Sequence, residues 1–244
     1  MWGEAWENYE TKDSQEFRSR GLVTSELETP DKGLEKVEEV LGFSPDEAFD
    51  SFKQESFTGE DYQTRAAAEP EGDKVVLKGF RDMSPHVLAH ESVHGQMMQP
   101  DGENYLPGEN QFENRIYDEF VARLAENEIS DLRIDEGMKD DFREARAEYL
   151  ATRKKYKGEQ LSRQFKSLWN DLEQTDRTTD EKIQKEIDQA LFPYQELREQ
   201  VLAAEAAKRY SKEHQYNIKE LLKPDEKLYS QTVEYIKQVE NDVA

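Results

Sequence analysis

The chain contains no cysteine among its 244 residues. This absence excludes disulfide bonds, thiolate metal sites and a thiol nucleophile. A metal ion would therefore have to be held by histidine and carboxylate side chains, which is a ligand set more typical of catalytic than of structural zinc sites. Histidine is also scarce, with four residues in the whole chain.

Apolar residues are few as well. They make up 35% of the chain, and the mean hydropathy is −1.04. This leaves little material for a large core, so we expect one small catalytic core together with extended, charged helices. No apolar run approaches the roughly 18 residues of a membrane span. The first residues lack a basic segment followed by an apolar run, so we expect no signal peptide and a cytoplasmic location.

Basic residues are outnumbered, with 33 Lys and Arg against 55 Asp and Glu and a net charge of −22. Nucleic acids and anionic membranes attract proteins through Lys and Arg, so neither is an expected partner. Such acidity would also suit a high-salt cytoplasm, which the sequence leaves open. Long-range electrostatic steering favours neutral or basic peptides over acidic ones as substrates.

Residues 90–94 read His-Glu-Ser-Val-His. On a helix, residues four apart project from one face, so the imidazoles of His90 and His94 can reach a single ion. Glu91 lies about 100° round the helix, where it can reach a water on that ion. The motif supplies two ligands and a base, and a third protein ligand has to come from elsewhere.

The flanking residues predict a helix at the motif and strands before it. A helix over residues 85–97 is expected because Ser84 suits the N-cap and proline suits the first helical position. Residues 74–78 are predicted to form a strand after the turn 70–73, with residues 62–68 as a hairpin partner.

A strand or hairpin followed by a helix with this motif resembles the active-site segment of zincin metallopeptidases. Val87 lies three places before His90, where zincins commonly carry Val or Thr, whereas Gln96 stands where they usually have an apolar residue. The resemblance covers about residues 60–128. It implies a zinc-dependent peptidase and, in the gluzincin branch, a glutamate ligand on a second helix downstream.

That second helix is predicted over residues 112–126, where apolar residues recur at helical spacing. By the resemblance, Glu119 is the third ligand. Glu126 lies two turns further on and is either a partner of a ligand histidine or the ligand itself, and Asp118 is a third candidate. In so acidic a chain, a solvated helix carboxylate is the plainer interpretation of each.

Other polar side chains offer alternatives. His86, His90 and His94 are spaced four apart, but a metal chelate of His86 and His90 would have no carboxylate at the base position. Gluzincins usually steady the oxyanion with a His or Tyr from beyond the second helix, which implies His214, with Tyr117 as a second candidate. The plainer interpretations are incidental surface histidines and an exposed histidine in a polar connector.

The predicted fold class is α+β and mostly helical, with a small zincin-like core and an all-helical extension. We expect a polar N-terminal arm at residues 1–28, the core at 29–129 and a region of long helices at 130–244, packed as antiparallel hairpins. These C-terminal helices are candidates for binding a partner or for self-association.

Proline and glycine positions predict where several helices begin or break. One N-terminal helix is expected to start at Pro30, and a second at residues 44–47, which form a capping box. In the C-terminal region, Gly158 is expected to bend or break a long helix and Pro193 to interrupt another. Residues 224–226 are expected to open the last helix.

Together these features predict a zinc-dependent peptidase. Zn²⁺ would be held by His90, His94 and Glu119, with Glu91 as the general base. The strand at residues 74–78 would offer its edge to an extended peptide or protein substrate. The alternatives are a non-enzymatic helical assembly or interaction protein with a structural or vestigial zinc site, and a latent proenzyme.

Overall fold

The described part of the chain is mostly helical with one small mixed sheet, so it has the predicted α+β class. The computed structural model describes residues 27–29, 31–54, 66–98, 106–108, 111–132, 134, 136–167, 185 and 189–243. Almost all of the predicted N-terminal arm, residues 1–28, lies outside the described residues.

Contacts between residues divide the chain into two compact units. The first unit is Met1–Leu132 with Ala206–Tyr235, and the second unit is Arg133–Glu205 with Ile236–Ala244. The predicted division into residues 1–28, 29–129 and 130–244 stays a prediction. Residues 206–235, expected in the C-terminal region, nevertheless have their contacts in the first unit.

The sheet has three strands in the order β1-β3-β2. The strands β2 (Ala66–Glu71) and β3 (Lys74–Gly79) form the predicted antiparallel hairpin. Their turn contains Gly72 at φ +69°, a left-handed conformation that glycine adopts without a steric penalty. Residues 62–65, the remainder of the predicted partner strand, lie outside the described residues. The sequence did not predict β1 (Ser51–Gln54), which pairs with β3 in parallel.

The prediction that residues 74–78 offer a free edge is wrong, because β3 is the central strand and is paired on both sides. Among the described strands, β1 and β2 are the outer strands, and each has a free edge beyond its pairing with β3. Pro70, which has no N–H, occupies a position whose backbone groups point away from β3. The N–H of Ala68, two residues earlier on the same side of the strand, also points away from β3. Of the two outer edges, that of β2 lies beside α3, and the N–H of Ala68 on it reaches the Glu91 carboxylate.

The N-terminal helix α2 (Asp31–Leu41) begins next to Pro30 as predicted and buries one apolar stripe, Leu34, Val37 and Leu41. The second predicted helix is wrong. Its capping box does form, with Ser44 N donating to Glu47 Oε1 at 3.0 Å, but it caps only the 3₁₀ turn η2 (Pro45–Glu47). The chain then extends into β1, where pairing with β3 outweighs the local helix signal.

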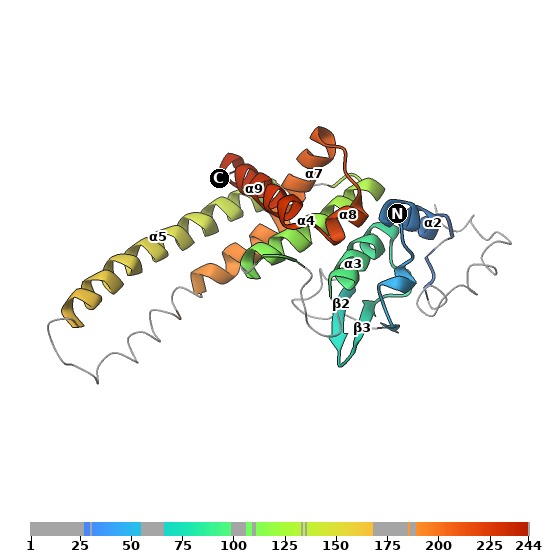
Figure 1. Ribbon diagram of the computed structural model, residues 1–244, viewed down its shortest axis with the longest axis horizontal. Coiled ribbons are helices and arrows are strands. Elements are labelled where there is room, and N and C mark those ends of the chain that lie inside the picture. The colour runs from blue at the N-terminus through green and yellow to red at the C-terminus, as the bar shows by residue number, and fades with distance from the viewer. Residues whose placement is uncertain are drawn as a thin grey trace. The chain divides into compact units, whose positions relative to one another are not determined.

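Helix α3 (Pro85–Met97) carries the histidine motif and has the predicted bounds, with Ser84 at the N-cap and proline in the first turn. It lies beside β2 and β3 and packs against α4 (Gln111–Ile129) (Figure 1). Gly95 permits a close approach here, because a Cβ at this position would lie 2.6 Å from Phe49 Cε1 and 2.8 Å from the Ala48 carbonyl oxygen. The α3 helix is thus held against the chain that follows η2.

Helix α4 buries the predicted apolar stripe against residues from the C-terminal part of the first unit. Phe120 is fully buried and packs edge-on against Tyr210 at a centroid distance of 5.4 Å. The short helix α8 (Ile218–Leu222), capped by the Asn217 side chain, also packs against α4. This packing fixes which face of α4 remains for α3.

Two predicted breaks in the C-terminal helices are not observed. The long helix α5 (Glu136–Ser167) continues through Gly158. Residues 189–197 are helical and include Pro193, and the helix widens into a π turn only at η4 (Arg198–Leu202) before α7 (Ala203–Glu213). A single glycine or proline lowers the stability of a helix without necessarily ending it.

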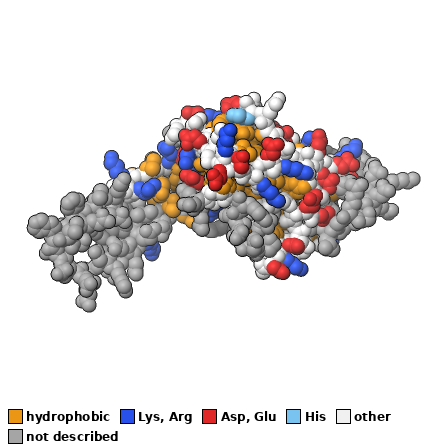
Figure 2. All heavy atoms as spheres, viewed as in Figure 1, with side chains coloured by type: hydrophobic (Ala, Val, Ile, Leu, Met, Phe, Trp, Pro, Cys, Tyr) orange, Lys and Arg blue, Asp and Glu red, His pale blue; other side chains and the backbone are white. Residues whose placement is uncertain are grey.

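The last helix, α9 (Glu226–Val243), begins two residues after Pro224 as predicted, with Asp225 Oδ1 accepting from Leu228 N at 2.7 Å. Within the second unit, Glu240 on this helix accepts a hydrogen bond from Tyr194 and pairs with Arg198 at 3.4 Å. None of the helices that the structure describes combines the length and the apolar character needed to cross a bilayer. On the face that Figure 2 shows, carboxylates and basic side chains are interspersed over the coloured, described part.

Candidate metal centre

Three predicted ligands come together between α3 and α4. The Nε2 atoms of His90 and His94 lie 3.1 Å apart. Glu119 Oε2 lies 3.4 Å from His94 Nε2, and Glu119 Oε1 lies 3.7 Å from His90 Nε2. Donors around a tetrahedral ion at about 2.1 Å are themselves about 3.4 Å apart, so these spacings fit one ion. Among the described residues this group can hold a metal ion.

The outer ring nitrogens face carboxylates. His94 Nδ1 lies 3.1 Å from Asp118 Oδ1 in a hydrogen bond. His90 Nδ1 lies 3.4 Å from Glu126 Oε2, which is an ion-pair contact rather than a hydrogen bond. A carboxylate at Nδ1 favours the tautomer with its proton there, which leaves a bare lone pair on each Nε2.

Two such lone pairs facing each other beside a carboxylate repel unless a cation or a proton lies between them. The donor set therefore fits a cation at the inner nitrogens. Asp118 and Glu126, which the sequence left open as ligands, lie instead beside the outer nitrogens. Of the three candidate carboxylates, only Glu119 faces both Nε2 atoms in this part of the structure.

Arg123 was not singled out from the sequence, yet its guanidinium joins two of these carboxylates. Its Nε donates to Glu119 Oε1 at 2.8 Å, and its Nη1 donates to Glu126 Oε2 at 2.8 Å. Arg123 follows Glu119 by four residues and precedes Glu126 by three, the spacings at which helix side chains meet. This local signal could have revealed the contact.

Glu91 is buried, with 8% of its surface exposed. Its Oε2 accepts a hydrogen bond from the backbone N–H of Ala68 on β2 at 2.9 Å. Burial raises the pKa of the Glu91 carboxyl, against the opposing influence of the two histidines and the Ala68 N–H. The predicted base thus lies beside the ligand histidines and is hydrogen-bonded to the edge strand β2.

The ligand side chains shift one another's pKa values. Burial disfavours the charged form of Glu119, but His90, His94 and Arg123 outweigh it and hold the pKa of that carboxyl well below its usual range. Burial likewise opposes the protonated form of His94, but Asp118 and Glu119 outweigh it and raise the pKa of His94 well above its usual range. The carboxylates gathered around the two imidazoles between α3 and α4 thus favour positive charge there.

No family model, curated protein or solved structure matches the chain. The zincin resemblance therefore rests on the residues of this chain alone.

The two predicted oxyanion stabilisers have their described contacts elsewhere. Tyr117 is fully buried, and its hydroxyl donates to the Leu221 carbonyl oxygen of α8 at 2.9 Å. His214 is exposed and stacks on Tyr210 at a centroid distance of 4.2 Å. Tyr117 precedes Glu119 by two residues, about 200° round the helix, so it faces away from the histidines. The oxyanion role of either residue stays a prediction.

His86 is not part of the group that can hold an ion in the described structure. Its Nε2 lies 3.3 Å from Ser84 Oγ, at the start of α3. The alternative chelate of His86 and His90 is therefore not assembled.

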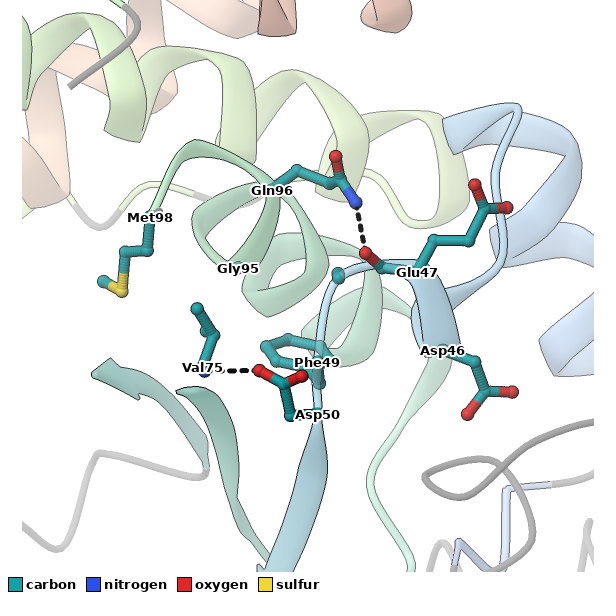
Figure 3. Close-up of a pocket in the computed structure, with 9 residues that line it drawn as sticks. Asp46, Glu47, Phe49, Asp50, Val75, Gly95, Gln96 and Met98 are labelled. Atoms are coloured by element: carbon teal, nitrogen blue, oxygen red, sulfur yellow. Dashed lines mark hydrogen bonds between the residues drawn. The ribbon is translucent and has the colours of Figure 1, made fainter. Parts of the chain in front are cut away.

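A separate cavity of about 230 Å³ lies at the C-terminal end of α3 (Figure 3). The Gln96 side chain there donates to the Glu47 carbonyl oxygen at 2.6 Å, and Val75 N donates to Asp50 Oδ2 at 2.8 Å. Gln96 is the position where zincins usually carry an apolar residue, and its amide here joins α3 to η2. The lining does not include the two ligand histidines, so the cavity and the candidate metal centre are distinct.

Proposed function

We propose that this chain is a metal-dependent peptidase that resembles the gluzincin branch of the zincins, with Zn²⁺ as its ion. The observation that carries the proposal is the convergence of His90 Nε2, His94 Nε2 and the Glu119 carboxylate, at distances of 3.1–3.7 Å, next to the buried Glu91. Imidazole and carboxylate ligands suit zinc, and three protein ligands leave one position open for chemistry.

His90, His94 and Glu119 would hold the ion. When bound, such an ion acidifies a water and polarises a carbonyl group. The protein supplies the arrangement: α3 provides both imidazoles, α4 provides the carboxylate, and Asp118 orients the His94 ring through its outer nitrogen.

Glu91 would act as the general base. The Ala68 N–H holds Oε2, which leaves Oε1 to accept a proton from the attacking water. Glu91 then passes this proton to the leaving amine as the peptide bond breaks. Its position one residue after His90 places it on the same side of α3 as the imidazoles.

The free edge of β2 is the candidate binding surface for an extended peptide. Ala68 and Pro70 direct their carbonyl oxygens away from β3, where they can accept hydrogen bonds from an added strand. Because Ala68 also holds Glu91, a peptide that pairs with this edge runs beside the base.

The test compares wild type with Glu91→Gln for zinc content and for cleavage of a mixed peptide library, followed by mass spectrometry. The proposal expects equal zinc in both proteins and cleavage by the wild type alone. Cleavage by Glu91→Gln would contradict the mechanism. A zinc-loaded wild type that cleaves nothing would contradict the peptidase and favour a structural metal site in an interaction protein.

A further inference from the structure

We propose that Arg123 is a positioning residue, which fixes Glu119 for ligation and, through Glu126, fixes the outer side of His90. This inference rests on the proposed function, because it concerns the same metal centre. It goes beyond the ligand motif, since nothing in that motif requires an arginine at this place.

Arg123 bears first on which carboxylate oxygen of Glu119 is available to the ion. Arg123 Nε binds Glu119 Oε1 at 2.8 Å, so this oxygen already has a strong partner. The other oxygen, Oε2, lies 3.4 Å from His94 Nε2 and has no hydrogen bond from Arg123. Arg123 therefore directs Glu119 to offer one oxygen to the ion rather than two.

Arg123 also acts on His90, through Glu126. Arg123 Nη1 binds Glu126 Oε2 at 2.8 Å, and the same oxygen lies 3.4 Å from His90 Nδ1. A guanidinium is planar, so a single rigid fork fixes both carboxylates at once. A lysine, with a flexible stem and a compact ammonium, can pair with both carboxylates but does not hold them in the same fixed geometry.

A role as a positive charge and a role in positioning predict opposite effects on cation binding when Arg123 is removed. The centre is rich in carboxylates, and Arg123 is the only lysine or arginine among the described residues that pairs with Glu119 or Glu126. If Arg123 acted only as a positive charge, its removal would strengthen the binding of a cation. If it acts by positioning, its removal weakens binding because the ligands lose their orientation.

The experiment titrates Co²⁺ into the metal-free full-length protein and follows the visible d–d absorption. The variants are Arg123→Lys, which keeps the charge, and Arg123→Met, which removes it. Arg115→Lys, on the exposed side of the same helix, is the matched control. Far-UV circular dichroism and the melting temperature report whether each variant folds.

Positioning predicts that Arg123→Lys binds Co²⁺ about tenfold to a hundredfold more weakly, with an altered absorption band, while Arg115→Lys matches the wild type. Arg123→Met should also bind more weakly. Should Arg123→Met fail to fold, Arg123→Lys decides alone.

This inference would be overturned if Arg123→Lys had the wild-type Co²⁺ affinity and spectrum, or if Arg123→Met bound Co²⁺ more tightly. Either result would not contradict the metal centre itself. A wild type that binds no Co²⁺ would instead overturn the proposed function together with the inference. The two failures are therefore distinguishable.

Discussion

The backbone N–H of Ala68 donates a hydrogen bond of 2.9 Å to Oε2 of Glu91, across 23 residues of sequence. This bond joins the edge strand β2 to the helix that carries the candidate metal ligands. It orients one carboxylate oxygen and leaves the other free. The candidate base and the candidate substrate-binding edge are therefore parts of one arrangement.

Ala68→Pro should impair cleavage without removing the metal. Proline lacks the N–H that holds Glu91, and the strand already carries proline at position 70 on the same side. We expect kcat to fall by roughly tenfold to a hundredfold, because a general base loses its orientation. Steady-state kinetics with zinc analysis would check this, and Ala66→Pro, on the same side of β2, is the control. Equal losses in both variants would contradict a specific role for the Ala68 N–H.

The three carboxylates of α4 should differ in their effect on metal affinity. Glu119→Gln removes an inner ligand and should abolish most zinc binding. Asp118→Asn removes the partner of the outer His94 nitrogen and should weaken zinc binding by about tenfold to a hundredfold. Competition with a coloured chelator measures both. If Asp118→Asn lost more zinc than Glu119→Gln, the assignment of ligand and partner would be reversed.

Metal removal should lower the thermal stability of the folded chain. An ion that binds only the folded state stabilises it by about 2.7 kcal/mol at a concentration one hundred times its Kd. We expect the melting temperature to fall when a chelator is added to the wild type. The same addition to Glu119→Ala should change nothing, and an equal fall in that variant would show that the chelator acts elsewhere.

Tyr117→Phe should reduce stability rather than catalysis. The hydroxyl of Tyr117 donates to the Leu221 carbonyl oxygen, so its loss leaves a buried acceptor without that partner and should cost about 1 kcal/mol of unfolding free energy. Urea unfolding measures this cost. A loss of about a hundredfold in kcat at unchanged stability would instead support the oxyanion role expected from the sequence.

Gly95→Ala should destabilise the protein by about 1–3 kcal/mol, because forcing a methyl group into close contact with its neighbours costs roughly that amount. The new Cβ would lie 2.6 Å from Phe49 Cε1 and 2.8 Å from the Ala48 carbonyl oxygen, and the backbone oxygen cannot move aside as a side chain can. Urea unfolding of this variant beside the wild type measures the difference. Unchanged stability would contradict the close approach of α3 to this segment.

Local signals in the sequence predicted the parts that carry the candidate ligands. Ser84 and the following proline predicted the start of α3, and the periodic apolar residues predicted α4, whereas the choice of Glu119 came from the zincin resemblance. These signals depend on residues within one or two turns, so they can be read without knowing the fold. The hairpin of β2 and β3 was predictable for the same reason.

The features that the sequence did not predict depend on contacts between residues far apart in the chain. The strand β1 is only four residues long and forms through its parallel pairing with β3, which took the position expected to be a free edge. Pro70 could have marked β2 as an edge strand, since proline cannot donate within a ladder. The helix expected to start at residues 44–47 is only a single 3₁₀ turn, because the chain after it joins the sheet.

The most direct test of the central claim is the zinc-to-protein ratio after reconstitution and dialysis, measured for the wild type beside Glu119→Ala. A centre built from His90, His94 and Glu119 predicts one zinc ion per chain in the wild type and a large loss in the variant. A wild type without zinc, or a variant that retains it fully, would contradict that centre.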